Sequence, residues 1–353
     1  MSEARNQAAR GNRFQELDVL RGLAAVSVLL FHYLTRYDQM YPPRSDVPFG
    51  FFNGAYGVQL FFVISGFVIF MTLSRCKTAS DFLVSRFSRL YPAYWAAALI
   101  TFVVGSMWPL PDQHYTVMQL LINLTMLQGF GNVPAIDGVY WSLGVELCFY
   151  AVMLVLFLTG QLENTVRLSV VWLAAAAGTY LLADVGIDVP WKIQQVFVLR
   201  YAELFVAGII FYELYMKGPS VGRVALLAAC FSVHLIDHGL ESGERILVIF
   251  ALVAIAVSGR VQVLCVRPLV WLGTISYTLY LTHSMIGFAL IRSLTEHEVP
   301  SIVAVPITII VALTLASAMT YVIERPAMRA IRSRRKATEV QLLQPQLVEV
   351  KSP

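Results

Sequence analysis

The stretch LDVLRGLAAVSVLLFHY, residues 17–33, decides the fold class of this chain. It opens an apolar run that continues to about residue 37, and roughly 20 such residues cross a hydrocarbon core about 30 Å thick. The whole chain of 353 residues has the same character, with 58% hydrophobic and only 14% charged residues. Soluble domains are about 45–50% apolar and about 25% charged. The composition therefore predicts a polytopic membrane protein in a lipid bilayer, with no nucleic-acid partner.

About ten apolar segments are candidate membrane spans, and counts of nine or eleven stay open because the seventh and eighth segments are short. They are too long and too uniform for barrel strands, which alternate every second residue. We therefore expect an all-α polytopic membrane helix bundle. No charged leader followed by a short apolar run and a cleavage site is present. The segments lie near 17–37, 55–74, 90–108, 140–160, 168–184, 197–216, 222–236, 244–258, 268–292 and 301–322.

The basic residues predict the orientation, because Lys and Arg accumulate in cytoplasmic loops. With the N-terminus inside, 19 of the 26 Lys and Arg residues fall in predicted cytoplasmic segments, namely 1–16, 75–89, 161–167, 217–223, 259–267 and 323–353. Five fall outside and two, Arg21 and Arg200, within spans. We expect both termini in the cytoplasm, with a short N-terminal segment over 1–16, one membrane domain over 17–326 and a basic, then polar tail over 327–353.

Ionisable residues within predicted spans need an explanation, because each costs about 2.5–3.5 kcal/mol on insertion scales. Arg21 and His32 are eleven residues apart, so they share one face of a helix about 16 Å apart along its axis. Counted from the predicted helix ends, His32, Glu146 and His283 come to one depth near the outer side. Single buried histidines are commonly structural, but a carboxylate and two histidines in one layer suggest proton-transfer chemistry.

The sequence SRFSRLYPAYW, residues 85–95, places Arg86 and Arg89 on one side of a helical turn at the cytoplasmic edge. One interpretation is ordinary anchoring by basic and aromatic residues at the interface. The other is an anion clamp, since arginine forks bind phosphate through two hydrogen bonds. The spacing alone leaves both interpretations open.

Six blocks in order resemble the membrane acyltransferase-3 family, from about Leu17 to Pro326. They are Arg21-x10-His32; FFVISGF at 61–67; Phe82, Arg86, Arg89, Pro92 and Tyr94; WSLGVELCFY at 141–150; LGTISYTLYLTH at 272–283; and ERP at 324–326. The resemblance implies a bacterial inner-membrane O-acyltransferase. Such proteins move an acyl group, usually acetyl, from acyl-coenzyme A to a hydroxyl of a surface or lipid-linked carbohydrate. His32 matches the family's essential histidine, and Arg86 and Arg89 match its second essential motif.

From the resemblance and the placement of charges we expect the donor's phosphates to bind Arg86 and Arg89, with Arg21 guiding its inner part. His32 would act as general base on the acceptor hydroxyl or would be acylated transiently, and Glu146 would orient it. Tyr277, Tyr280 and His283 would line the site. We expect neither a metal nor a tightly bound cofactor. Some family members carry an additional soluble esterase-like domain that this sequence does not show, so we expect either a single-part acyltransferase or one that needs a separate periplasmic or assembly partner.

Two rival classes of function stay open. A transporter of small anions or sugars would use the same intramembrane charges along a permeation path, although the sequence has no repeated half and no paired broken helices. A flippase-like partner of a polysaccharide assembly system would not need the pair Arg86 and Arg89. The sequence does not identify the acceptor, nor does it separate acetyl from succinyl or other acyl groups.

Overall fold

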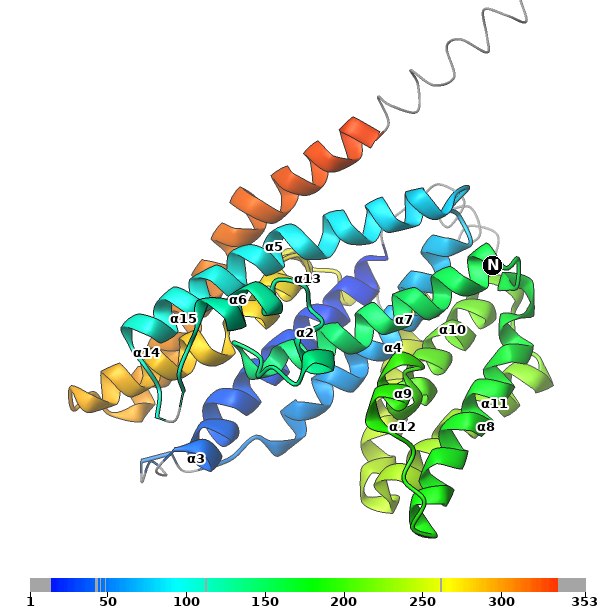
Figure 1. Ribbon diagram of the computed structural model, residues 1–353, viewed down its shortest axis with the longest axis horizontal. Helices are drawn as coiled ribbons and strands as arrows, with labels where there is room; N and C mark the ends of the chain where they lie inside the picture. The colour runs from blue at the N-terminus through cyan, green and yellow to red at the C-terminus, as the bar shows by residue number, and fades with distance from the viewer. Residues whose placement is uncertain are drawn as a thin grey trace, which may run out of the picture.

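Helices make up the regular structure of residues 14–335, the part of the chain that the computed structural model describes except for 42, 43, 45, 48, 112 and 261 (Figure 1). No strand occurs among these residues, which confirms the all-α class. Most of the two predicted polar ends, 1–13 and 336–353, lies outside the described residues. The elements are α2 Gln15–Phe31, η1 His32–Arg36, α3 Tyr37–Met40, η2 Phe52–Tyr56, α4 Gly57–Leu73, α5 Ala79–Met107, α6 Val117–Asn123, η3 Gln128–Gly131, η4 Gly138–Tyr140, α7 Trp141–Leu158, η5 Leu162–Asn164, α8 Thr165–Asp184, α9 Trp191–Val196, η6 Leu199–Tyr201, α10 Ala202–Lys217, α11 Val221–His238, α12 Leu240–Val257, η7 Gln262–Leu264, α13 Arg267–Thr282, α14 Ser284–Glu296, α15 Ser301–Met319 and η8 Thr320–Glu324.

Seven helical segments in this part of the chain are long and apolar enough to cross a membrane, which confirms a multi-pass membrane protein. The other three predicted spans also form helices, but they are shorter, more charged or interrupted. α10 has 16 residues, α12 begins with Glu241, Glu244 and Arg245, and the predicted span 268–292 is divided into α13 and α14 at His283. The count of ten spans and the cytoplasmic placement of both termini remain predictions.

The predicted cytoplasmic loop 75–89 is mostly helical, which corrects the expected start of the third span near residue 90. α5 begins at Ala79, where the Thr78 hydroxyl accepts from the Asp81 N–H and the Asp81 carboxylate accepts from the Thr78 N–H. This reciprocal cap satisfies N–H groups that a helix start leaves free. Arg86 and Arg89 therefore lie on a rigid helix that continues into the bundle.

Two pairs of facing glycines set the closest helix crossings. α2 packs most extensively on α13, and α4 on α10. Gly22 of α2 faces Gly273 of α13, where an added Cβ would come within 2.6 Å of the Gly273 nitrogen. Gly66 of α4 and Gly208 of α10 face each other in the same way. Small residues let helix backbones approach closely in membranes, so these four positions fix how the central helices cross.

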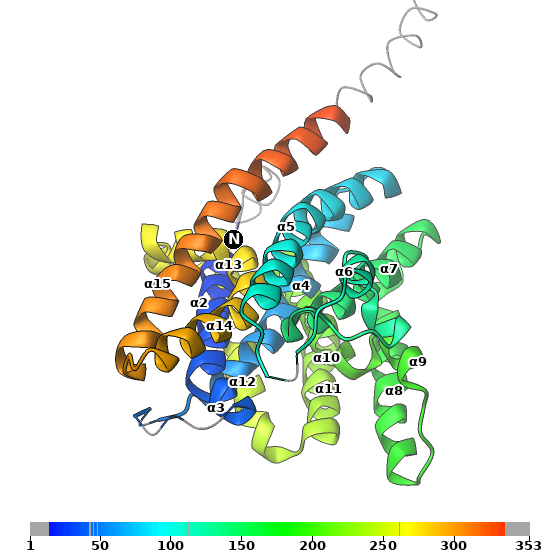
Figure 2. The ribbon, with the colours of Figure 1, turned by 60° about the vertical axis from the view of Figure 1, so that its left-hand side comes forward.

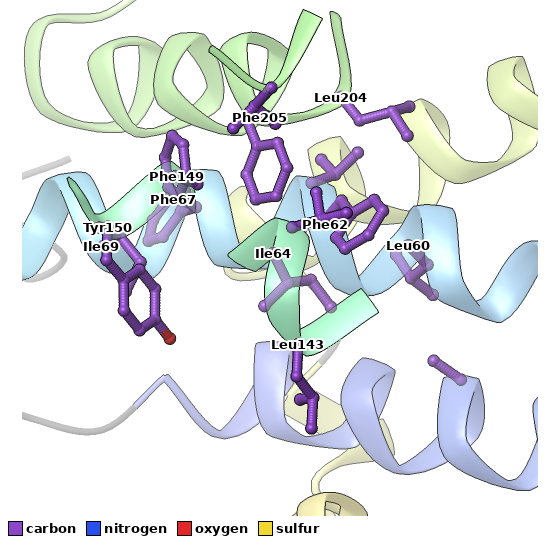
Figure 3. Close-up of a cluster of buried hydrophobic side chains, with 14 of the residues drawn as sticks. Leu60, Phe62, Ile64, Phe67, Ile69, Leu143, Phe149, Tyr150, Leu204 and Phe205 are labelled. Carbon is purple, nitrogen blue, oxygen red and sulfur yellow. The ribbon is translucent and has the colours of Figure 1, made fainter. Parts of the chain in front are cut away.

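Aromatic side chains fill the space between α4, α7 and α10 (Figure 3). Phe149 stacks on Phe205 with ring centroids 4.1 Å apart, and Phe62 lies 4.9 Å from Phe205. All three side chains are buried. Because helix association in lipid depends on close packing, this cluster holds α4, α7 and α10 together.

Two five-residue π-helical turns interrupt otherwise regular helices. The first, η1, begins at His32, and the second, η8, ends at Glu324. π-turns redirect side chains and often occur at functional sites. The helix continues from η8 to Arg335 and runs beside the start of α5, where Arg332 donates to Ser88 (3.2 Å) and Arg335 pairs with Asp81 (3.4 Å) (Figure 2). We call this end of the bundle, marked by Arg332 and Arg335, the basic end.

Candidate active site

His32 and His283 meet at the end of the bundle opposite the basic end. Nδ1 of His32 lies 3.2 Å from Nε2 of His283, and the two rings meet edge to face with centroids 4.8 Å apart. His283 lies in the break between α13 and α14 and is fully buried. The structure therefore brings together two of the three residues that were expected to share a layer.

A cavity of about 410 Å³ lies beside His32. We call it the histidine chamber. Its lining includes Arg36, Gln113 and Tyr280, which offer hydrogen-bonding groups, and the aromatic ring of Trp141. Small-molecule sites are typically concave, with a few polar groups that fix the orientation of the ligand. The chamber has this character and places one imidazole in its wall.

Glu146, the third residue of the expected layer, lies elsewhere. Its Oε1 accepts from the Ser65 hydroxyl and the Tyr150 hydroxyl, both at 2.7 Å, and it lines a pocket with Arg21, Arg86 and Arg89. The prediction that Glu146 shares one layer with His32 and His283 was therefore wrong.

Glu146 lies away from His32 because the helix over residues 138–158 begins deeper in the bundle than the sequence predicts. The Asp137 carboxylate accepts from the Met285 N–H (2.9 Å), and the Tyr280 hydroxyl donates to the Val139 carbonyl (3.1 Å). The start of this helix is thus already level with His283. Glu146, seven residues after Val139, lies about 10 Å nearer the basic end.

The pocket around Arg21, Arg86 and Arg89 is small, about 40 Å³, and is called the arginine pocket below. Nη2 of Arg86 donates to Thr72 (3.3 Å) and to Ser85 (3.1 Å), whereas its Nε is buried without a hydrogen-bond partner among the described residues. The residues that line it include three arginines and one carboxylate, that of Glu146. A surplus of arginine donors favours a bound anion, above all phosphate.

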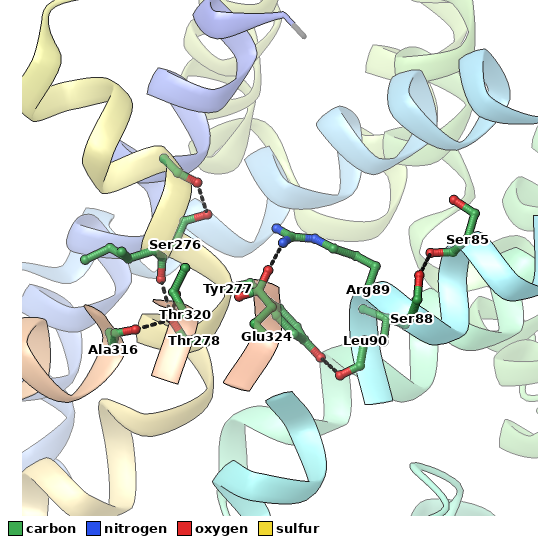
Figure 4. A network of polar contacts seen from close by, with 12 residues as sticks. Ser85, Ser88, Arg89, Leu90, Ser276, Tyr277, Thr278, Ala316, Thr320 and Glu324 are labelled. Atoms are coloured by element: carbon green, nitrogen blue, oxygen red, sulfur yellow. Dashed lines mark hydrogen bonds and ion pairs between the residues drawn. The ribbon is translucent and has the colours of Figure 1, made fainter. Parts of the chain in front are cut away.

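Arg89 forms an ion pair through Nη1 with Glu324, at the end of η8 (Figure 4). Its guanidinium also lies 5.5 Å from the centre of the Tyr277 ring. Glu324 belongs to the ERP block at 324–326, and no role was predicted for it from the sequence. One signal in the sequence could have predicted this pair. Glu324 is a carboxylate at the inner end of the last span, on the side where the cytoplasmic arginines are predicted.

The tyrosines Tyr277 and Tyr280 lie between the two sites. Tyr277 lines the arginine pocket and donates to the Leu90 carbonyl (2.9 Å), and Tyr280 lines the histidine chamber and bonds to the Ser142 hydroxyl (2.7 Å). A cavity of about 50 Å³ between them is lined by both tyrosines, Arg21 and Glu146. This cavity therefore shares lining residues with both sites. Arg21, Glu146 and Tyr277 also line the arginine pocket, and Tyr280 also lines the histidine chamber.

A larger cavity, of about 480 Å³, opens between α5 and α7. Apart from Arg86 and the two tyrosines Tyr91 and Tyr150, apolar side chains line it. It does not include either histidine. Its size alone does not make it the reaction site, because group transfer needs a proton acceptor beside the reacting hydroxyl.

This arrangement can be compared with known proteins. A family model described as an acyltransferase domain, of the acyltransferase-3 type, matches residues 14–321. The chain belongs to the acyltransferase-3 family. It is therefore a membrane O-acyltransferase, which confirms the resemblance and sets aside the transporter and flippase-like alternatives. No solved structure matches the chain.

Three curated relatives illustrate the family. The chain is 28% identical to the exopolysaccharide production protein ExoZ of Rhizobium meliloti over 305 residues, which covers 80% of this chain and 92% of ExoZ. It is 25% identical to the putative peptidoglycan O-acetyltransferase YrhL of Bacillus subtilis, over 88% of this chain but only 54% of YrhL. It is 27% identical to the putative membrane-bound transacylase BcsY of Komagataeibacter xylinus, over 77% of this chain and 72% of BcsY.

Proposed function

We propose that this acyltransferase moves an acyl group, most simply acetyl, from acyl-coenzyme A to a hydroxyl of a surface or lipid-linked carbohydrate in the bacterial inner membrane. The proposal rests on one observation, the separation of two groups of polar side chains at opposite ends of the bundle. A cluster of three arginines lies toward the basic end, an imidazole stands in the wall of the histidine chamber toward the other end, and a cavity of about 50 Å³ shares lining residues with both.

The donor would bind at the arginine pocket from the basic end, which we expect to face the cytoplasm because Lys and Arg accumulate on that side. Its phosphates would be held by Arg86 and Arg89, with Arg21 farther along the pantetheine arm. The pocket holds only about 40 Å³, so side chains must move as the donor enters. Arg89 can keep its pair with Glu324 and still offer Nε and Nη2, because a guanidinium has five donors.

The chemistry at His32 follows from its hydrogen bonds. Nδ1 of His32 lies 2.8 Å from the Val28 carbonyl oxygen, which can only accept, so Nδ1 carries a proton. In the neutral ring Nε2 then has a free lone pair. Nε2 takes the proton of the acceptor hydroxyl while the hydroxyl oxygen attacks the thioester carbonyl. The tetrahedral intermediate collapses, the C–S bond breaks, and the leaving thiolate recovers the proton from Nε2 as the free thiol.

A second order of events uses the same atom. Nε2 attacks the thioester first, the thiolate leaves, and the acceptor hydroxyl then takes the acyl group from the acyl-imidazole. Pre-steady-state release of coenzyme A without an acceptor would indicate this covalent route.

The acceptor is proposed to enter the histidine chamber from the opposite end, where Trp141 offers an apolar face to a sugar ring. ExoZ by its name takes part in exopolysaccharide production, and YrhL is a putative peptidoglycan O-acetyltransferase. Their names support a carbohydrate acceptor here. A separate periplasmic or assembly partner that delivers the acceptor is part of the proposal.

The test uses the purified full-length protein in lipid nanodiscs with radiolabelled acetyl-coenzyme A. Label should be transferred to an oligosaccharide acceptor, or released by slow hydrolysis when no acceptor is present. Arg86→Ala should abolish donor binding, and Arg86→Lys should restore little of it, because an ammonium lacks the planar fork. The control is Arg167→Ala, which removes an exposed arginine of α8. Normal coenzyme A binding by Arg86→Ala would contradict the proposed donor site.

Mass spectrometry of surface glycans from a deletion strain would identify the acceptor and the acyl group. A glycan that loses an acetyl or other acyl ester on deletion and regains it on complementation is the expected result. Unchanged acylation of every surface and lipid-linked glycan would contradict a carbohydrate acceptor.

A further inference from the structure

The histidine site contains a directional chain of hydrogen bonds that ends on His32. Nδ1 of His283 lies 2.8 Å from the Tyr280 carbonyl oxygen and 3.1 Å from that of Leu279. A carbonyl oxygen only accepts hydrogen bonds, so Nδ1 of His283 carries a proton. In the neutral imidazole Nε2 of His283 is consequently an acceptor.

This acceptor faces Nδ1 of His32 at 3.2 Å. Nδ1 of His32 therefore has two neighbours, Nε2 of His283 and the Val28 carbonyl oxygen, and both can only accept. The proton of a neutral His32 is fixed on Nδ1 from two sides. The lone pair is left on Nε2, the ring nitrogen with no protein hydrogen-bond partner in the described part of the chain.

We propose that His283 is a positioning residue, which holds His32 in the Nδ1–H tautomer and presents Nε2 to the reacting groups. The inference rests on the proposed function of His32. A carboxylate or carbonyl commonly plays this part behind a working histidine. A neutral imidazole orients the ring without adding a negative charge, so it stabilises the imidazolium less than a carboxylate would. His32 is then able to return its proton readily to the leaving thiolate.

His283 is itself held from two sides. The Tyr33 hydroxyl donates to the His283 carbonyl oxygen (2.8 Å), and Tyr33 follows His32 directly in η1. The Asp137 carboxylate accepts from the Met285 N–H (2.9 Å) and so caps the first turn of α14. These contacts fix the break between α13 and α14, and with it the direction of the His283 ring.

Two substitutions that differ by one methylene test the inference. A glutamine side chain places its terminal amide near the position of Nε2, so His283→Gln can still accept from Nδ1 of His32. An asparagine side chain ends near the position of Nδ1, so His283→Asn does not reach His32. We expect His283→Asn to lower kcat by about 10–100-fold, the usual cost of losing such a partner. His283→Gln should stay within a few-fold of wild type, and donor KM should be unchanged in both.

The measurement is a full kinetic analysis of the two variants in nanodiscs, with donor and acceptor varied separately. Equal kcat in His283→Asn and His283→Gln overturns the inference, and so does a loss that falls on donor KM. Tyr33→Phe covers the case in which His283→Asn does not fold, because it removes only the hydroxyl that holds the His283 carbonyl. It should lower kcat a few-fold, and an unchanged kcat overturns the inference.

His32→Ala separates this inference from the proposed function. An inactive His32→Ala beside a fully active His283→Asn overturns only the positioning role. A fully active His32→Ala overturns the role of His32 itself.

Discussion

Glu324, at the end of the π-helical turn η8, is ion-paired with Nη1 of Arg89 on α5. The Glu324 side chain is 2% exposed and that of Arg89 is 23% exposed, so the pair is largely shielded from solvent. The pair also joins the C-terminal helix to the helix that carries the proposed donor site. Glu324 therefore holds one edge of the Arg89 guanidinium and directs the other edge to the arginine pocket.

Removing this carboxylate should weaken donor binding. Glu324→Ala is expected to raise the Kd for acyl-coenzyme A about tenfold, or about 1.4 kcal/mol, because Arg89 loses its fixed orientation. Glu324→Gln keeps an acceptor and should lose less. Isothermal titration in nanodiscs measures the effect, with Glu296→Ala as the control for loss of an exposed ion pair. A Kd that falls in Glu324→Ala would mean that the carboxylate competes with the donor for Arg89.

Glu146 should influence the donor and leave the pH dependence of His32 unchanged. Glu146→Gln keeps an oxygen for Ser65 and Tyr150 but removes the one carboxylate that lines the arginine pocket. The pocket becomes more positive, so the Kd for the anionic donor should fall at least about fivefold, since two charges about 4 Å apart interact by about 1 kcal/mol in water and by more in a protein. Donor titrations and a pH profile of kcat check both statements. An acid limb that moves while the Kd stays constant would contradict this assignment.

The glycine crossing between α4 and α10 should tolerate no side chain. A Cβ on Gly208 would collide with the Val63 carbonyl oxygen and approach Gly66 Cα to 2.9 Å. Gly208→Ala should therefore destabilise the fold by about 1–3 kcal/mol, the usual cost of overpacking. Thermal unfolding in detergent measures it. The matched control is Gly178→Ala on α8, where a Cβ meets no atom within 4 Å, and its Tm should be unchanged or slightly raised. Equal Tm values for the two variants would contradict the close crossing.

Trp141 should contribute to acceptor binding only. Its ring lines the histidine chamber and remains 44% exposed. Trp141→Ala is expected to raise the acceptor KM about tenfold, with donor Kd unchanged, because an aromatic face for the sugar ring is lost. Trp191→Ala removes a similarly exposed tryptophan outside the chamber and is the control. A rise in donor Kd instead would place Trp141 on the donor path.

Much of the fold was predictable, because apolar runs of about 20 residues identify spanning helices. The proximity of His32 and His283 could also be predicted, since both are ionisable residues near the same end of predicted spans. The position of Glu146 was not, because counting along one helix assumes that all helices begin at one plane. Asp137 and Val139 bind Met285 and Tyr280, and these tertiary contacts start the 138–158 helix well inside the bundle.

The two π-turns were likewise invisible in the sequence. Each shifts the helical register by a local change in backbone hydrogen bonding, which apolar periodicity does not reveal. They fall at His32 and at Glu324, so the departures from regular geometry coincide with the two proposed sites.

Paired measurements on His32→Ala test the central claim most directly, because the claim assigns donor binding and chemistry to two separate sites. The Kd for acetyl-coenzyme A and the rate of acetyl transfer are measured on the same nanodisc preparation, with His297→Ala, an exposed histidine, as control. We predict that the Kd is unchanged and that the rate of acetyl transfer falls by about 10²–10⁴-fold, the contribution of a general base. Transfer at the wild-type rate by His32→Ala would contradict the account.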